Sequence, residues 1–139
     1  MSRSLLPLLL ILAAPACNFD ASPQPVVRTA SAGEAPAQRK DVLPGALSSA
    51  MSEGEVILID VRTQREWDAG HIEGARHIPL NTISPDHPDI QQIPKDATVY
   101  MICGIGVRSA RAANILADSG WQDVRNVVGG MDAWSMLGN

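Results

Sequence analysis

The sequence predicts an α/β domain with a mainly parallel sheet, preceded by residues that do not belong to the fold. Two observations support this. The short, continuous apolar run at 56–59 is typical of a strand buried on both faces, 98–102 is a second clear buried strand, and 124–128 is predicted to be another strand. The segments between them are long enough for helices, and the clearest one carries apolar residues at helical spacing. Strands that alternate with helices favour parallel pairing, because parallel neighbours need a crossover connection.

The first part of the domain starts near Asp41. Apolar residues at every fourth position predict a helix over 41–52 that ends before Gly54. The strand 56–59 follows. A short helix over 63–68 is predicted next, because Thr63 followed three residues later by Glu66 forms a capping box.

The remaining elements lead to the C-terminus. In order, they are strand 75–78, a proline-containing loop over 81–95 with one helical turn, strand 98–102, helix 109–119, strand 124–128 and helix 131–137. Gly120 is expected to stop the helix before it. Aromatic residues make up only 4% of the chain, so aliphatic side chains must build most of the core. We expect Trp67, Trp121 and Trp134 to be buried in that core.

The overall charge excludes one class of partner. The formal net charge is −4, and the sequence has no basic patch or stripe of the kind that binds nucleic acid. His77 and His87 lack metal-ligand spacing, and a zinc site is not readable. We therefore expect no metal, no cofactor and no nucleic-acid partner.

The first 16 residues have the build of a secretory signal peptide. Arg3 gives a positive start, an apolar run follows from Leu5, and small residues stand at Ala14 and Ala16. The run is too short to span a membrane, which takes about 20 residues. Residues 17–40 are rich in Ala, Pro and Ser, and we interpret them as a disordered tether before a domain at 41–139.

Cys17 directly follows the small residues. This arrangement resembles the lipobox of bacterial lipoproteins, in which the Cys becomes the lipidated N-terminus. The resemblance implies a lipid anchor at Cys17 and a place on the periplasmic side of a bacterial membrane. The alternative is ordinary cleavage after Ala16, which leaves a soluble periplasmic or secreted protein with a free thiol.

Cys103 follows a buried strand and leads through a short loop into a helix. Ligands of parallel sheets lie at the carboxyl ends of strands. The loop offers unpaired backbone N–H groups, glycines that let it curl, and the cation Arg108. A Cys at the mouth of such a cradle should have a lowered pKa and react as a thiolate. The expected nucleophile is Cys103, and the expected substrate-binding residues are Gly104, Ile105, Gly106, Val107, Arg108 and Ser109.

Two stretches resemble the signatures of the rhodanese family. The first runs from Leu58-Ile59-Asp60-Val61-Arg62 through Glu66-Trp67 and Gly70-His71-Ile72-Glu73-Gly74-Ala75 to Ile78-Pro79. The second runs from Cys103–Ser109 through Gly120 and Gly129-Gly130-Met131 to Trp134. Together they cover nearly all of 56–137 in the right order.

The resemblance implies a five-stranded, mainly parallel sheet with helices on both faces. It also implies a sulfurtransferase in which Cys103 carries a persulfide. The expected donor is a small sulfur-containing anion such as thiosulfate, or a persulfide, and the acceptor is a thiol, cyanide or a protein. Asp60, Arg62 and His71 are expected to support the structure near the site.

Two alternative functions involve the same residues. Cysteine phosphatases use the roomier loop C-x5-R, whereas the spacing here is C-x4-R, which favours a sulfur atom over a phosphoryl group. The second alternative is a membrane-tethered sulfur carrier or binding module with little turnover of its own, and the sequence does not separate it from an enzyme.

Overall fold

The computed structural model describes residues 37–138. The expected signal peptide, Cys17 and the tether up to residue 36 lie outside the described residues, as does Asn139. Between residues 37 and 138, no helix has both the length and the apolar character needed to cross a membrane.

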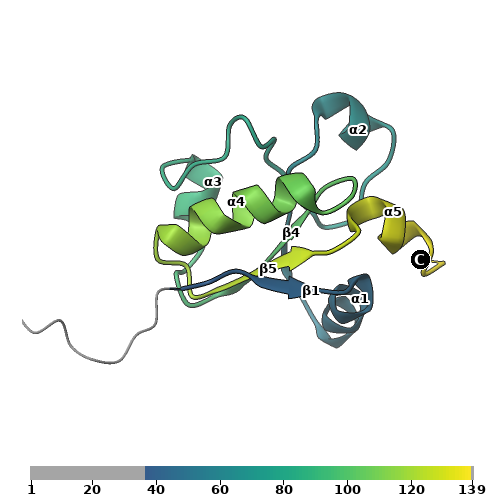
Figure 1. Cartoon of the computed structure of the whole chain (residues 1–139), viewed down its shortest axis with the longest axis horizontal. Coiled ribbons are helices and arrows are strands. Elements are labelled where there is room, and N and C mark those ends of the chain that lie inside the picture. Colours follow the sequence, from purple (N-terminus) through teal and green to yellow (C-terminus); the bar gives the residue numbers. More distant parts are fainter. Residues whose placement is uncertain (1–36, 139) are drawn as a thin grey trace, which may run out of the picture. The chain divides into compact units, whose positions relative to one another are not determined.

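Five strands form one parallel sheet, shown in Figure 1. The strands are β1 (Lys40–Val42), β2 (Ile57–Asp60), β3 (Arg76–His77), β4 (Thr98–Ile102) and β5 (Asp123–Val127), in the spatial order β1-β5-β4-β2-β3. Every pair of neighbours runs parallel, so β4 is central and lies between β5 and β2. The predicted α/β class and its parallel sheet are confirmed.

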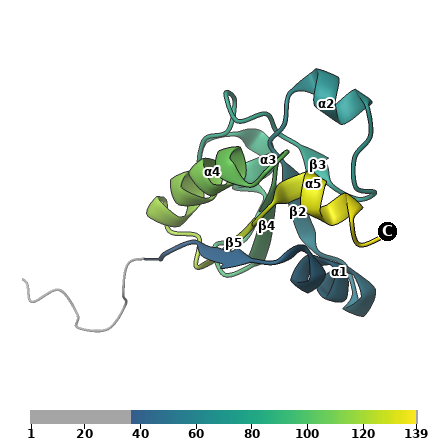
Figure 2. The ribbon, with the colours of Figure 1, turned by 45° about the vertical axis from the view of Figure 1, so that its right-hand side comes forward.

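Helices cover both faces of the sheet (Figure 2). They are α1 (Pro44–Glu53), α2 (Gln64–Asp68), α3 (Pro88–Gln91), α4 (Val107–Asp118) and α5 (Gly130–Ser135). Alternate residues of β4 point to opposite faces. Val99 and Met101 pack with α4 and the segment around α3, whereas Tyr100 and Ile102 pack with α1 and α5. The central strand is therefore buried on both sides, as its continuous apolar run predicts.

The predicted start of the domain was wrong in one respect. Lys40–Val42 is a strand rather than tether and helix, and α1 begins only at Pro44. Leu43, the first residue of the expected apolar stripe, is 69% exposed. β1 forms because its backbone pairs with β5, from Lys40 opposite Arg125 to Val42 opposite Val127. Proline suits the first turn of a helix, where its missing N–H has no partner to lose.

Two other predictions changed in detail. α4 begins at Val107, two residues earlier than expected, so Val107, Arg108 and Ser109 belong to its first turn. Trp121 and Trp134 are buried, but Trp67 is only half-buried and stacks on His71 and His77. Trp67 therefore holds the segment from α2 to β3 together outside the main core.

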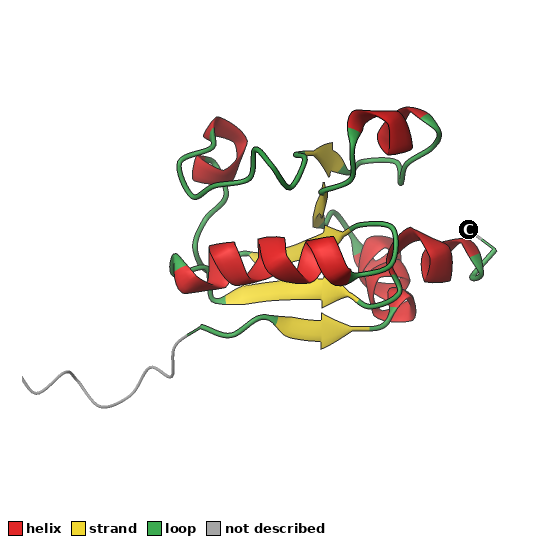
Figure 3. Cartoon of the chain, turned by 45° about the horizontal axis from the view of Figure 1, so that its top comes forward, coloured by secondary structure: helices red, strands yellow, loops and turns green. Residues whose placement is uncertain are grey.

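The strand directions determine where the site lies. All the strands point the same way, and the loops that leave β2, β4 and β5 gather at their carboxyl ends (Figure 3). The N–H of Val61 donates to the carbonyl of Ile102, which ties the loop after β2 to the end of β4. Cys103 is the next residue, so the candidate site is built on the most central strand.

Candidate active site

Cys103 lies at the turn between β4 and α4. Gly106 is the N-cap of α4 and has a φ of 95°, a left-handed conformation that glycine adopts without strain. An added side chain at Gly106 would press on the backbone of Val127, Val128 and Gly129. The glycine therefore lets the loop curl back over the Cys103 sulfur while it packs against the end of β5.

The Cys103 sulfur lies among hydrogen-bond donors. The N–H of Gly106 donates to it at 3.1 Å, and the Ser109 hydroxyl oxygen lies 3.3 Å away. Burial raises the pKa of the thiol, but hydrogen bonds from the hydroxyl and N–H of Ser109 and from the N–H groups of Gly106 and Ile105 outweigh it. The net effect is a pKa lower than the ordinary value, as the sequence predicts, so the site favours a thiolate.

The sulfur is less accessible than the sequence suggests. Cys103 was expected at the mouth of the cradle, but the residue is 0% exposed. Ile105 and Val107, in contrast, are 63% and 61% exposed and form an apolar rim at the surface of the loop. A reactant can reach the sulfur only if this loop or a neighbouring side chain moves.

The start of α5 supports the loop from behind. The N–H of Met131 donates to the carbonyl of Cys103 at 2.7 Å, and the N–H of Asp132 donates to the carbonyl of Gly104 at 3.1 Å. The loop carbonyl groups therefore accept hydrogen bonds from N–H groups in the first turn of α5 that have no partner within the helix. A side chain at Gly130 would collide with both carbonyl oxygens, so the backbone of α5 must approach the loop closely.

Arg108 is not a free cation. Its guanidinium donates two hydrogen bonds, of 2.7 and 2.6 Å, to the two carboxylate oxygens of Glu66. Glu66 is fixed on α2 by the predicted capping box with Thr63. Hydrogen bonds from Arg108 hold the pKa of Glu66 far below its usual range, and the pair raises the pKa of Arg108. Residues 103–111 contain no acidic residue, so the carboxylate beside Arg108 comes from another element of the fold.

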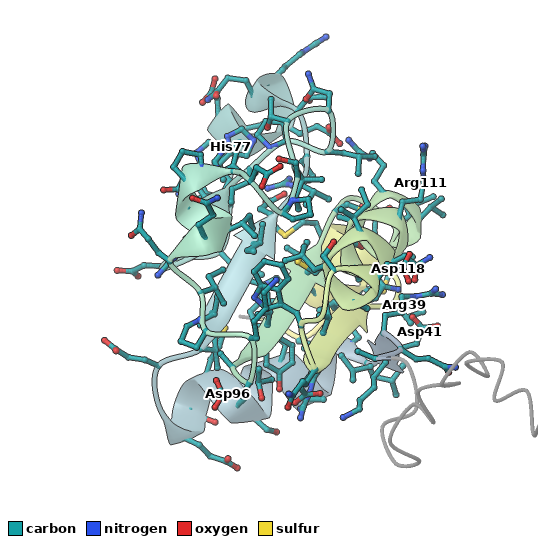
Figure 4. All side chains as sticks on the ribbon, turned by 90° about the vertical axis from the view of Figure 1, so that its left-hand side faces the viewer. Arg39, Asp41, His77, Asp96, Arg111 and Asp118 are labelled. Atoms are coloured by element: carbon teal, nitrogen blue, oxygen red, sulfur yellow. The ribbon has the colours of Figure 1, made fainter. Side chains whose placement is uncertain are left out.

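A hollow of about 640 Å³ lies beside this pair. Its lining includes Arg62, Leu80, Arg108 and Arg111. Arg111 makes no hydrogen bond or ion pair with any residue in 37–138, and Figure 4 places it on the same side of the molecule as Arg39 and Asp41. The hollow therefore offers one unpaired cation to a polar or anionic reactant.

The supporting residues fall into two groups. Asp60 and Arg62 are both buried and joined by hydrogen bonds of 2.9 and 3.0 Å, and Arg62 also donates to the carbonyl of Gly70 at 2.7 Å. This pair fixes the loop after β2, in agreement with its expected structural role. His71 is exposed and stacks on Trp67 with 3.7 Å between ring centroids, so it supports α2 rather than the sulfur.

Within 37–138, no group of three or more His, Cys, Asp or Glu side chains is arranged to hold a metal ion.

Comparison with known proteins agrees with this geometry. The model of the rhodanese-like domain matches residues 43–137. The chain belongs to the rhodanese-like domain family. A rhodanese-like domain protein from Staphylococcus aureus has a similar structure, with a TM-score of 0.61 and 38% identity over 68% of this chain and 90% of that chain.

Two relatives are similar in sequence. Mycobacterium tuberculosis MoeZ, named a probable adenylyltransferase/sulfurtransferase, is 35% identical over 71% of this chain and 25% of its own. Bacillus subtilis YqhL is 42% identical over 55% of this chain and 59% of its own. The match thus spans only a quarter of MoeZ and about three fifths of YqhL. Of these two relatives, MoeZ is the one whose name associates it with sulfur transfer.

Sequence reasoning missed three contacts of the rhodanese-like site. Glu66 was identified as a capping residue and as part of the first signature, but nothing nearby in the sequence links it to Arg108. Asn126 bonds to Ser109 at 2.7 Å and to Asp41 at 2.9 Å, although neither Asn126 nor Asp41 had been associated with the site. These contacts depend on strand register and helix placement, which no local motif reveals.

Proposed function

We propose that the protein is a sulfurtransferase that carries sulfane sulfur as a persulfide on Cys103 and takes it from a persulfide donor in preference to thiosulfate. The observation that carries the proposal is the Cys103 sulfur itself. It is surrounded by N–H and O–H donors that lower its pKa, and it therefore needs no separate general base.

The reaction has two balanced steps. The Cys103 thiolate attacks the outer sulfur of a donor persulfide, the donor S–S bond breaks, and the donor leaves as a thiolate. A new S–S bond then joins that sulfur to Cys103. In the second step an acceptor thiolate or cyanide attacks the outer sulfur, the S–S bond to Cys103 breaks, and the Cys103 thiolate is restored. The acceptor leaves as a persulfide or as thiocyanate. No net oxidation or reduction occurs, and the loop N–H groups stabilise the sulfur charge in both steps.

The Glu66–Arg108 pair is the basis for the donor preference. Thiosulfate is a dianion, and it would need a free cation beside the loop. Arg108 is already neutralised by Glu66 through two short hydrogen bonds. A persulfide group carries only one negative charge at its reacting end, so its donor loses less from this neutralisation. Arg111 remains unpaired and can attract the polar end of such a donor.

A sulfur carrier with little turnover is the second candidate, and one observation favours it. Cys103 is fully buried, which slows exchange with small acceptors. In this case a partner protein would have to open the loop before the sulfur could leave.

We also propose that the domain acts outside the cytoplasm, held at a membrane through Cys17. The proposal rests on the leader and the Cys that follows it in the sequence. A tether of about 20 residues would keep the domain clear of the lipid surface. Mass spectrometry of the protein from a membrane fraction of its host would detect a lipid on residue 17, and an unmodified residue 17 would refute the anchor.

Steady-state kinetics test the enzymatic proposal. The full chain is supplied with glutathione persulfide or thiosulfate and with cyanide as acceptor, and thiocyanate is measured. We expect turnover with both donors, a higher kcat/KM for the persulfide, and no turnover for Cys103→Ser. Stable loading of Cys103 without turnover would favour the carrier, and the absence of both would refute sulfur transfer.

A further inference from the structure

The Ser109 hydroxyl lies between two acceptors that compete for its proton. Its oxygen is 3.3 Å from the Cys103 sulfur and 2.7 Å from the side-chain oxygen of Asn126. All three residues are buried, so water does not share the proton. A hydroxyl carries one proton and can donate it to only one acceptor at a time.

Asp41 decides which way the Asn126 amide faces. The two residues are direct neighbours across β1 and β5, and the Asn126 amide nitrogen lies 2.9 Å from the Asp41 carboxylate. The hydrogen bond from Asn126 lowers the pKa of Asp41, so the carboxylate is ionised at neutral pH and only accepts. Arg39 also donates to this carboxylate, at 3.2 Å. The amide nitrogen must therefore face Asp41, which leaves the amide oxygen facing Ser109.

We infer that Asn126, oriented by Asp41, is a positioning residue that competes with the Cys103 sulfur for the Ser109 proton and so weakens the hydrogen bond that Ser109 donates to the thiolate. Both distances are ordinary for a donated hydrogen bond, because sulfur is larger than oxygen, so the two acceptors share the proton. While the hydroxyl donates to Asn126, Ser109 turns a lone pair toward Cys103. The protonated thiol can donate to that lone pair. The thiolate gains the Ser109 proton only when the Ser109–Asn126 bond breaks.

This arrangement affects the empty and loaded forms differently. In the empty form, the negative charge sits on the Cys103 sulfur, and competition from Asn126 weakens the Ser109 hydrogen bond that stabilises this charge. In the persulfide of the proposed function, the charge moves to the outer sulfur, and the inner sulfur no longer competes for the Ser109 proton. The chain from Asp41 to Ser109 therefore penalises the empty thiolate more than the persulfide, and it favours loading.

The other charged groups near Cys103 stay constant in the test below. They are Arg108 of α4 with its partner Glu66 of α2, and the Asp60–Arg62 pair after β2. They contribute equally in every variant, so they do not produce a dependence on Ser109.

The test is a cycle of two substitutions, measured as the thiol pKa of Cys103. The full chain is alkylated with iodoacetamide across a range of pH, and the tryptic peptide of residues 96–108 separates Cys103 from Cys17. Asn126→Ala frees the Ser109 proton for the thiolate, and a hydrogen bond to a charged group is worth about one pKa unit. We expect the thiol pKa to fall by that amount. In a Ser109→Ala background, Asn126→Ala should leave the pKa unchanged.

Asn126→Ala removes a buried side chain, so the folding of this variant must be checked by circular dichroism. Asp41→Asn is a second variant that leaves the Asn126 side chain in place. Asp41 is half exposed, and its replacement lets the Asn126 amide turn over. We expect Asp41→Asn to lower the thiol pKa of Cys103 by less than Asn126→Ala does. Most of this decrease should be absent when Asp41→Asn is made in the Ser109→Ala background.

An unchanged or raised pKa in folded Asn126→Ala, or an equal shift with and without Ser109, would overturn the inference. No sulfur donor enters the titration, so it stands or fails separately from sulfur transfer.

Discussion

Glu66 and Arg108 lie 42 residues apart in the sequence, yet they are joined by two hydrogen bonds of 2.6 and 2.7 Å beside the Cys103 loop. Glu66 belongs to a capping box on α2, and Arg108 belongs to the first turn of α4. One ion pair thus fixes α2 to the Cys103 loop and neutralises a cation beside it.

Glu66→Gln should improve the use of thiosulfate. The substitution leaves the positive charge of Arg108 without a counter-charge near the loop. A unit charge about 6 to 7 Å from a dianion in water attracts it enough to raise kcat/KM about tenfold. The persulfide donor should change much less. Kinetics at low ionic strength measure the effect, since salt screens it. Glu73→Gln, an exposed residue with the same change of charge, is the control, and equal gains in both variants would contradict the assigned role of Glu66.

Gly130→Ala should disrupt the active loop. A methyl group at this position would collide with the carbonyl oxygens of Cys103 and Gly104. We expect a loss of about 2 to 4 kcal/mol in the free energy of unfolding and a large loss of activity. Gly120→Ala is the matched control, because Gly120 also has a positive φ but has open space around it. Urea unfolding should show a loss of about 1 kcal/mol there. Similar losses in both variants would mean that backbone conformation, not loop contact, is responsible.

Arg62→Met should destabilise the fold by leaving the Asp60 carboxylate buried without its partner. Removal of one member of a buried pair costs about 3 to 5 kcal/mol. Urea unfolding measures the loss. The double variant Asp60→Asn with Arg62→Met should recover part of it, because the unpaired charge is gone. A loss in the double variant as great as in Arg62→Met would indicate that packing, rather than charge, makes Arg62 important.

Acid should destabilise the domain through Asp123. Burial raises the pKa of Asp123, but hydrogen bonds from Arg125, Lys40 and Thr98 outweigh it and bring the net value far below the usual range. A carboxylate with a lowered pKa contributes stability that is complete above its unfolded value of about 4 and is lost as the pH falls further. The urea concentration at the unfolding midpoint should therefore decrease when the pH is lowered below about 4.

Asp123→Asn should lower the urea midpoint at neutral pH and reduce its further decrease below about pH 4. Asp86→Asn, exposed and without a hydrogen bond or ion pair among residues 37–138, should leave the profile unchanged. If the urea midpoint of Asp123→Asn decreased as steeply at low pH as that of the wild type, groups other than Asp123 would cause the acid sensitivity.

The features that the sequence predicted are those encoded locally. The loop from Cys103 to Ser109, the capping box at Thr63 and the apolar strands each depend on neighbouring residues, so they could be recognised without a structure. The strand β1 could not, because three residues at the sheet edge form a strand only through pairing with β5. The prediction that Trp67 lies in the core was wrong for a similar reason. Tertiary packing brings its stacking partners His71 and His77 against it outside the core.

The least predictable part of the site was its electrostatics. The absence of acidic residues near Arg108 in the sequence suggested a free cation, whereas the fold brings Glu66 against it. The contact of Asn126 with Ser109 and Asp41 likewise follows from the β1–β5 register. Both contacts change what the loop does chemically without changing its motif.

The central claim is that Cys103 carries the transferred sulfur. Mass spectrometry of the full chain after incubation with glutathione persulfide, followed by mapping of the peptide of residues 96–108, tests it most directly. We expect this peptide to gain the mass of one sulfur atom, to lose it again on addition of cyanide, and to show no gain in Cys103→Ser. An unloaded wild-type peptide, or sulfur transfer that persists in Cys103→Ser, would contradict the account.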